Sequence, residues 1–136
     1  MNKFTAKTRR SPRKIRQTLC PLRLSGEKMV ALFSRYSLMR ERVTLTDGYI
    51  RARLVLVDGS YLEFAEYVQV AEATIQVVTY SYHWATKDNH LIRRWDNTPH
   101  FPQLSNFPHH IHQGEAVVAG QPVDIFVVLD EIAHSL

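Results

Sequence analysis

Residues 50–70 read IRARLVLVDGSYLEFAEYVQV, and this stretch decides the fold. Apolar and polar side chains alternate on both sides of Asp58-Gly59, which is the pattern of two half-buried antiparallel strands joined by a tight turn. A three-residue loop starting at Val57 keeps the apolar side chains of both strands on one face, and it puts Gly59 where a left-handed bulge favours glycine. The cross-strand pairs of this register are Leu54 with Leu62, Ala52 with Phe64 and Arg53 with Glu63.

A second hairpin is predicted further along the chain. Residues 74–84 are rich in Ile, Val, Thr, Tyr and Trp, which favour strands, and residues 91–96 form the returning strand after the polar loop 85–90. Residues 97–114 contain three prolines and Gly114, so we expect an irregular segment there.

Helices are expected at both ends of the domain. Apolar side chains recur at helical spacing from Glu27 to about Arg40, after the candidate N-cap Ser25. The same spacing recurs over Val123–Leu136, where Asp124 suits the positive start of a helix. The sequence therefore predicts an α+β fold, in which an antiparallel sheet of about four strands, formed by two hairpins, carries an N-terminal and a C-terminal helix.

Charge is divided unevenly along the chain, whose formal net charge is +4. Residues 1–28 hold nine Lys or Arg and one acid, a charge of +8, whereas residues 29–136 hold eight basic and twelve acidic residues, a charge of −4. We interpret residues 1–28 as a basic flexible tail, added by a start site upstream of Met29, and residues 29–136 as a single domain. A phosphate-binding arm and an organelle transit peptide are the other interpretations of this composition.

Composition also excludes some classes of protein. No apolar run approaches the roughly 18 residues that a membrane span needs, so we expect no membrane partner. The one cysteine, Cys20, rules out an internal disulfide and fits a reducing compartment, so we expect a cytoplasmic protein. No cofactor is indicated, and the oligomeric state stays open.

The stretch from His83 to His112 carries the residues suited to chemistry, and it holds six of the seven histidines. Histidine transfers protons near neutral pH, the guanidinium of Arg94 matches a phosphate, and aromatic side chains stack on the bases of single-stranded RNA. These residue types suit metal-independent cleavage of RNA, in which one histidine takes the proton of a 2′-hydroxyl and another protonates the leaving oxygen. The candidate catalytic residues are His83, Arg94, Asp96, His100, His109, His110 and His112.

Two alternatives stay open for these residues. His109, His110 and His112 are suitable zinc ligands together with Asp96, although their spacing is poor for a closed site and neither HExxH nor CxxC occurs. A metal-dependent hydrolase would follow from that arrangement. The same side chains also suit a hydrogen-bond network that holds a long loop to the sheet, anchored by Arg94 and Asp96 on one face of a strand. In that case the protein is a binding module without catalysis.

Several blocks of the chain resemble a known family of small bacterial and archaeal toxins. The blocks are Tyr80-Ser81-Tyr82-His83-Trp84, Arg94-Trp95-Asp96-Asn97, Pro99-His100 and Phe107-Pro108-His109-His110-Ile111-His112, together with the hairpin at Asp58-Gly59. They resemble the TumE family over about residues 30–133, and Phe101 departs from its pattern, which often has a second histidine there. The resemblance implies the toxin of a type II toxin–antitoxin system, neutralised by a cognate helix-turn-helix antitoxin. It implies no mechanism.

Overall fold

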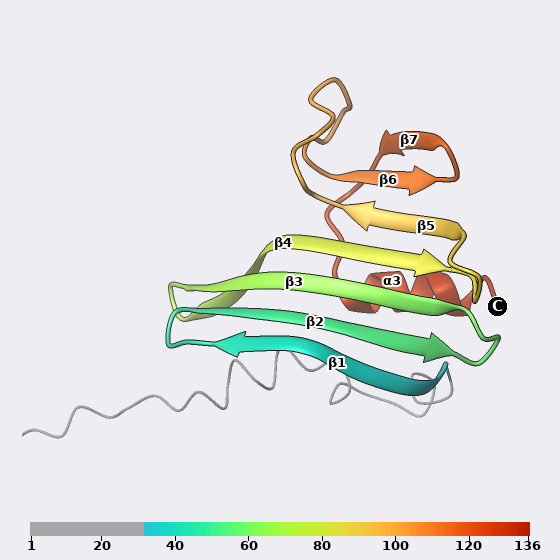
Figure 1. Ribbon diagram of the computed structural model, residues 1–136. Coiled ribbons are helices and arrows are strands. Elements are labelled where there is room, and N and C mark those ends of the chain that lie inside the picture. The colour runs from blue at the N-terminus through green and yellow to red at the C-terminus, as the bar shows by residue number, and fades with distance from the viewer. Residues whose placement is uncertain (1–31) are drawn as a thin grey trace, which may run out of the picture.

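One antiparallel sheet, with one helix on one of its faces, makes up residues 32–136, the part of the chain that the computed structural model describes (Figure 1). The seven strands stand in the sheet in the order in which they occur in the sequence, so each strand pairs with the next one along the chain. The strands are β1 (Phe33–Val43), β2 (Asp47–Leu56), β3 (Tyr61–Ala71), β4 (Thr74–Ala85), β5 (Leu91–Asp96), β6 (His110–Gln113) and β7 (Ala116–Ala119). The helix, α3, spans Ile125–Ala133.

The expected α+β fold with four strands and two helices is wrong. Phe33–Val43, which includes most of the expected N-terminal helix, forms β1 and pairs with β2. The helical spacing of apolar residues does not mark burial within this strand, because Tyr36 and Met39 are 55% and 49% exposed. Pairing with β2 gives this segment its structure, and such a tertiary interaction overrides local spacing. The start of the expected helix and the tail 1–28 lie outside the described residues.

The hairpin formed by β6 and β7 was also not expected. It occupies the end of the segment that was predicted to be irregular, and that prediction is correct only up to residue 109. Gly114 has a φ of +59° in the turn between the two strands, so it marks a hairpin turn. Each strand has only four residues, which is too short for alternation of polar and apolar side chains to stand out.

Both predicted hairpins are confirmed. In the first, β2 and β3 pair in the three-residue-loop register, and Gly59 has a φ of +88°. In the second, Ser81–Ala85 at the end of β4 pair with Leu91–Asp96 of β5. The register pairs found in the first hairpin are Leu54 with Leu62, Ala52 with Phe64 and Arg53 with Glu63.

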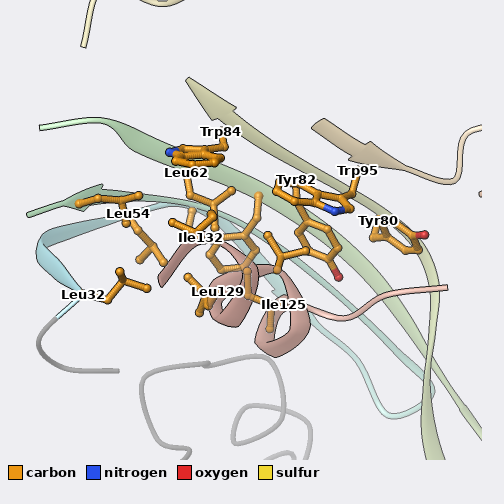
Figure 2. Close-up of a cluster of buried hydrophobic side chains, with 14 of the residues drawn as sticks. Leu32, Leu54, Leu62, Tyr80, Tyr82, Trp84, Trp95, Ile125, Leu129 and Ile132 are labelled. Carbon is orange, nitrogen blue, oxygen red and sulfur yellow. The ribbon is translucent and has the colours of Figure 1, made fainter. Parts of the chain in front are cut away.

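The hydrophobic core lies between α3 and one face of the sheet (Figure 2). Alternate residues of the central strands point into it, among them Phe64, Tyr82 and Trp95, each no more than 1% exposed. Asp124 begins the helix as its N-cap, where its Oδ1 accepts hydrogen bonds from the first-turn amides. The helix residues buried in the core are Ile125, Val128, Leu129 and Ile132, which recur at the helical spacing seen in the sequence, whereas Leu136 is exposed. No helix within residues 32–136 is long and apolar enough to cross a membrane.

Candidate active site

The sheet face that turns away from α3 carries a row of charged and imidazole side chains. Successive cross-strand partners in this row are Glu63 on β3, His83 on β4, Arg94 on β5 and His112 on β6. Successive side chains of a strand point to opposite faces, so these residues face away from the core that their strand neighbours build. Cross-strand partners lie about 5 Å apart at Cβ, so Arg94 lies between two histidines.

Arg94 is held in place by Asp96, which lies two residues further along β5 and on the same face. Its Nε donates to Asp96 Oδ2 at 2.9 Å, and its Nη2 binds the same oxygen. The backbone amide of Thr98 donates to the other carboxylate oxygen at 2.7 Å. Burial works to raise the pKa of Asp96, but the hydrogen bonds from Thr98 and Arg94 outweigh it and lower that pKa. An ionised carboxylate therefore orients the guanidinium.

A depression of about 450 Å³ opens on this face over strands β2 to β5 and the loop after β4. This volume is in the range of small-molecule sites, about 300–1,000 Å³. Three guanidinium groups and one imidazole contribute to its wall, so the depression suits an anionic ligand. Its lining consists of Arg51, Arg53, Tyr61, Glu63, Phe64, Ala65, Ser81, His83, Asn89 and Arg94.

The two histidines on either side of Arg94 have lowered pKa values. Burial lowers the pKa of His83 below its ordinary value of 6.5, and the positive charge of Arg94 lowers it further. Burial and then the charge of Arg94 lower the pKa of His112 in the same way. Both rings are therefore neutral at neutral pH, and each has one nitrogen that can accept a proton.

The irregular segment 97–109 folds over the β6 end of the row. The ring of Phe101 lies 5.0 Å from the ring of His110 and 5.8 Å from that of His112, and His100 lies 6.5 Å from His110. His110 Nδ1 donates to the carbonyl oxygen of Pro108 at 2.9 Å. The Nε2 atoms of both β6 histidines are buried and have no hydrogen-bond partner among the described residues. The loop covers these two rings, whereas His83 and Arg94 line the depression.

His109 lies apart from the other candidate residues. Its Nδ1 is 2.8 Å from the hydroxyl of Tyr80, and the two rings stack with centroids 5.9 Å apart. It lines a second groove of about 520 Å³ beside Val123 and Asp124, at the start of α3. The structure therefore brings together His83, Arg94, Asp96, His100, His110 and His112 and separates His109 from them.

The separation of His109 also divides the ligand set considered for zinc. Within residues 32–136, no three or more His, Cys, Asp or Glu side chains are placed to hold one metal ion. The adjacent pair His109-His110 contributes to two different parts of the molecule.

Sequence reasoning missed the wall of the depression formed by β2 and β3. Glu63 binds two arginines there: Arg51 Nε donates to its Oε1 at 2.9 Å, and Arg53 Nη2 donates to its Oε2 at 2.6 Å. A signal for this cluster was present, because the predicted register already opposed Arg53 to Glu63. Arg51, two residues away on the same strand, necessarily shares that face.

Over residues 32–136, fold and site together define a single-sheet domain with a basic, histidine-bearing surface site. The family model described as Toxin TumE matches residues 24–135, and the chain belongs to this family of toxins. The family predicted from the sequence blocks is thereby confirmed. No curated protein matches the chain, and no solved structure does.

Proposed function

We propose that this toxin-family protein is the toxin of a type II toxin–antitoxin system and acts as a metal-independent ribonuclease on single-stranded RNA. The observation that carries the proposal is the position of Arg94 between His83 and His112 on neighbouring strands. A group that binds phosphate thus has a proton-transfer group on either side of it. Asp96 is the positioning residue for Arg94.

In the proposed reaction, Arg94 binds the phosphodiester. His83 takes the proton of the 2′-hydroxyl, the 2′-oxygen bonds to phosphorus, and the bond from phosphorus to the 5′-oxygen breaks. His112 donates a proton to the leaving 5′-oxygen through Nδ1, because its Nε2 is buried under the loop. The products therefore end in a 2′,3′-cyclic phosphate and a 5′-hydroxyl. Strands β4 and β6 lie two strand spacings apart, about 9.6 Å, which allows base and acid to stand on opposite sides of one phosphate.

The proposed roles require His83 to be neutral and His112 to be protonated when the RNA is bound. The lowered pKa of His83 keeps its ring neutral and ready to accept a proton at neutral pH. The proposed acid, His112, must carry a proton, and the negative charge of a bound phosphate raises the pKa of a neighbouring imidazole. Arg94 stabilises the charge that develops on the phosphoryl oxygens during the reaction.

Cleavage of single-stranded RNA by the purified full-length protein in excess EDTA tests the proposal. Alanine at His83, Arg94 or His112 is expected to lower the rate about 100-fold or more, the usual contribution of positioned acid–base and charge-stabilising groups. His134→Ala is the control, because this side chain is 77% exposed at the C-cap of α3, outside the row, and its loss should leave the cleavage rate unchanged. Cleavage that EDTA abolishes would indicate the metal-dependent hydrolase instead.

His109→Ala separates the catalytic interpretation from a purely architectural one. Its hydrogen bond to Tyr80 lies outside the row, so this change is expected to lower the melting temperature and to leave the cleavage rate per folded molecule unchanged. If all histidine variants lose stability and toxicity in parallel, the cluster is architecture and the protein is a non-catalytic binding module.

The biological role is tested in growing cells. We propose that residues 29–136 are the toxic domain and that residues 1–28 are dispensable. Expression of the full chain and of the form starting at Met29 should both arrest growth, and co-expression of a helix-turn-helix antitoxin from a neighbouring gene should restore it. Healthy growth at verified expression of both forms would contradict the toxin role.

A further inference from the structure

The depression beside His83 contains groups that the proposed reaction does not use. Glu63 joins Arg51 and Arg53 side by side through hydrogen bonds to its two carboxylate oxygens. The charges of these three groups sum to +1 when Glu63 is ionised. Burial works to raise the pKa of Glu63, but the two arginines outweigh it and keep that pKa low. Each guanidinium has five N–H donors, so donors remain after Glu63 is bound.

Tyr61 forms a fixed aromatic surface in the same depression. The guanidinium carbon of Arg53 lies 4.5 Å from the centroid of its ring, and its hydroxyl donates to Asn89 Oδ1. The ring centroid lies 6.3 Å from that of His83. A ring that is held at its hydroxyl and backed by a cation is well suited to stack on a nucleobase, since every base presents a π-face.

We infer that this depression is a nucleotide subsite for single-stranded RNA, in which a nucleobase stacks on the Tyr61–Arg53 pair while Arg51 and Arg53 bind a phosphate next to the one that reacts. This inference rests on the proposed function, because it names the part of the RNA that lies beside His83. The nucleotide held here is the one whose 2′-hydroxyl gives its proton to His83. Arg51 and Arg53 then hold the phosphate on the 5′ side of that nucleotide.

The geometry of the sheet supports this placement. Arg53, Glu63, His83 and Arg94 are successive cross-strand partners, so the subsite and the reacting phosphate lie along one row of the same face. From β2 to β5 this row covers three strand spacings, about 14 Å. The side chains of Arg51, Arg53 and Arg94 all line the one depression between these strands, so they can bind two neighbouring phosphates of a single strand.

Binding of an oligonucleotide that cannot be cleaved tests the subsite separately from the reaction. The probe is a short fluorescent single-stranded oligonucleotide with 2′-O-methyl groups, which has no 2′-hydroxyl proton and so cannot be cleaved. The readout is its Kd for the full chain, measured by fluorescence anisotropy. Tyr61→Ala is expected to raise Kd about tenfold or more, whereas Tyr61→Phe, which keeps the ring, stays within about twofold. Arg51→Gln and Arg53→Gln should each lower the slope of log Kd against log salt by about 0.7, one phosphate contact.

Arg93→Gln is the matched control, because it removes one positive charge from the same strand as Arg94 but on the face where Arg93 meets Glu131. Equal Kd values for wild type, Tyr61→Ala and the two β2 variants would overturn the subsite, and RNA cleavage with cyclic phosphate ends would still support the ribonuclease. Binding with the expected variant effects but no cleavage of any RNA would sustain the subsite and refute the ribonuclease. A wild-type protein that does not bind the probe even at low salt would refute the subsite.

Discussion

Asp96→Asn is the substitution that best tests how the candidate site is held together. Asp96 is 1% exposed, and its carboxylate joins Arg94 Nε at 2.9 Å to the amide of Thr98 at 2.7 Å. An asparagine oxygen still accepts from Thr98, but the amide nitrogen then faces a guanidinium that has no acceptor. A hydrogen bond to a charged group contributes about 1.5–3 kcal/mol. Solvent recovers part of this loss, because Arg94 is 35% exposed. We therefore expect a loss of about 1–2 kcal/mol in unfolding free energy at neutral pH.

The pH dependence of this loss follows from the direction of the pKa shift. The pKa of Asp96 is lower in the folded protein than its ordinary value of 3.8. Its contribution to stability is therefore complete at pH values above 3.8 and is lost as the pH falls through the lowered folded value. The difference between wild type and Asp96→Asn should be large in urea unfolding at about pH 7 and should shrink at about pH 3.

Glu131→Gln is the control for the Asp96 experiment. The Arg93–Glu131 pair has an N···O distance of 3.1 Å, but its side chains are 34% and 40% exposed, so its loss should change stability by less than about 1 kcal/mol. A loss for Asp96→Asn that is no larger than this, or one that is equal at both pH values, would refute the view that an ionised Asp96 orients Arg94.

Three further predictions concern the core, the helix and the reaction. Phe64→Ala should lower the unfolding free energy by about 3–5 kcal/mol in urea, since this side chain is 1% exposed; a loss below about 1 kcal/mol would mean that the core is misplaced. Asp124→Ala should lower it by about 1 kcal/mol, whereas Asp124→Asn, which still caps, should change it little. The RNA cleavage rate should fall on the acid side only below pH 6.5, because the base His83 has a lowered pKa; a fall that begins well above 6.5 would exclude His83 as the base.

The local sequence pattern was sufficient to predict those elements whose apolar side chains reach the core. Alternation on both sides of Asp58-Gly59, with a glycine at the bulge, allowed only one register that keeps the apolar faces together, and the structure has that register. The stripe of α3 was predictable for the same reason, because the helix packs its apolar side on the sheet. The prediction was wrong for β1, since Tyr36 and Met39 follow helical spacing but are not buried.

For the candidate site, the sequence by itself determined which residue types are present and which of them share a face of one strand, as Arg94 and Asp96 do. Only the tertiary structure decided that Arg94 lies between His83 and His112, that Glu63 and its arginines extend the row, and that His109 lies elsewhere. The physical reason is that side chains alternate between the two faces of a sheet within each strand, so the sequence shows which residues of one strand share a face. The neighbours across strands depend on strand order and on the missed β6–β7 hairpin, which long-range backbone hydrogen bonds and core packing select.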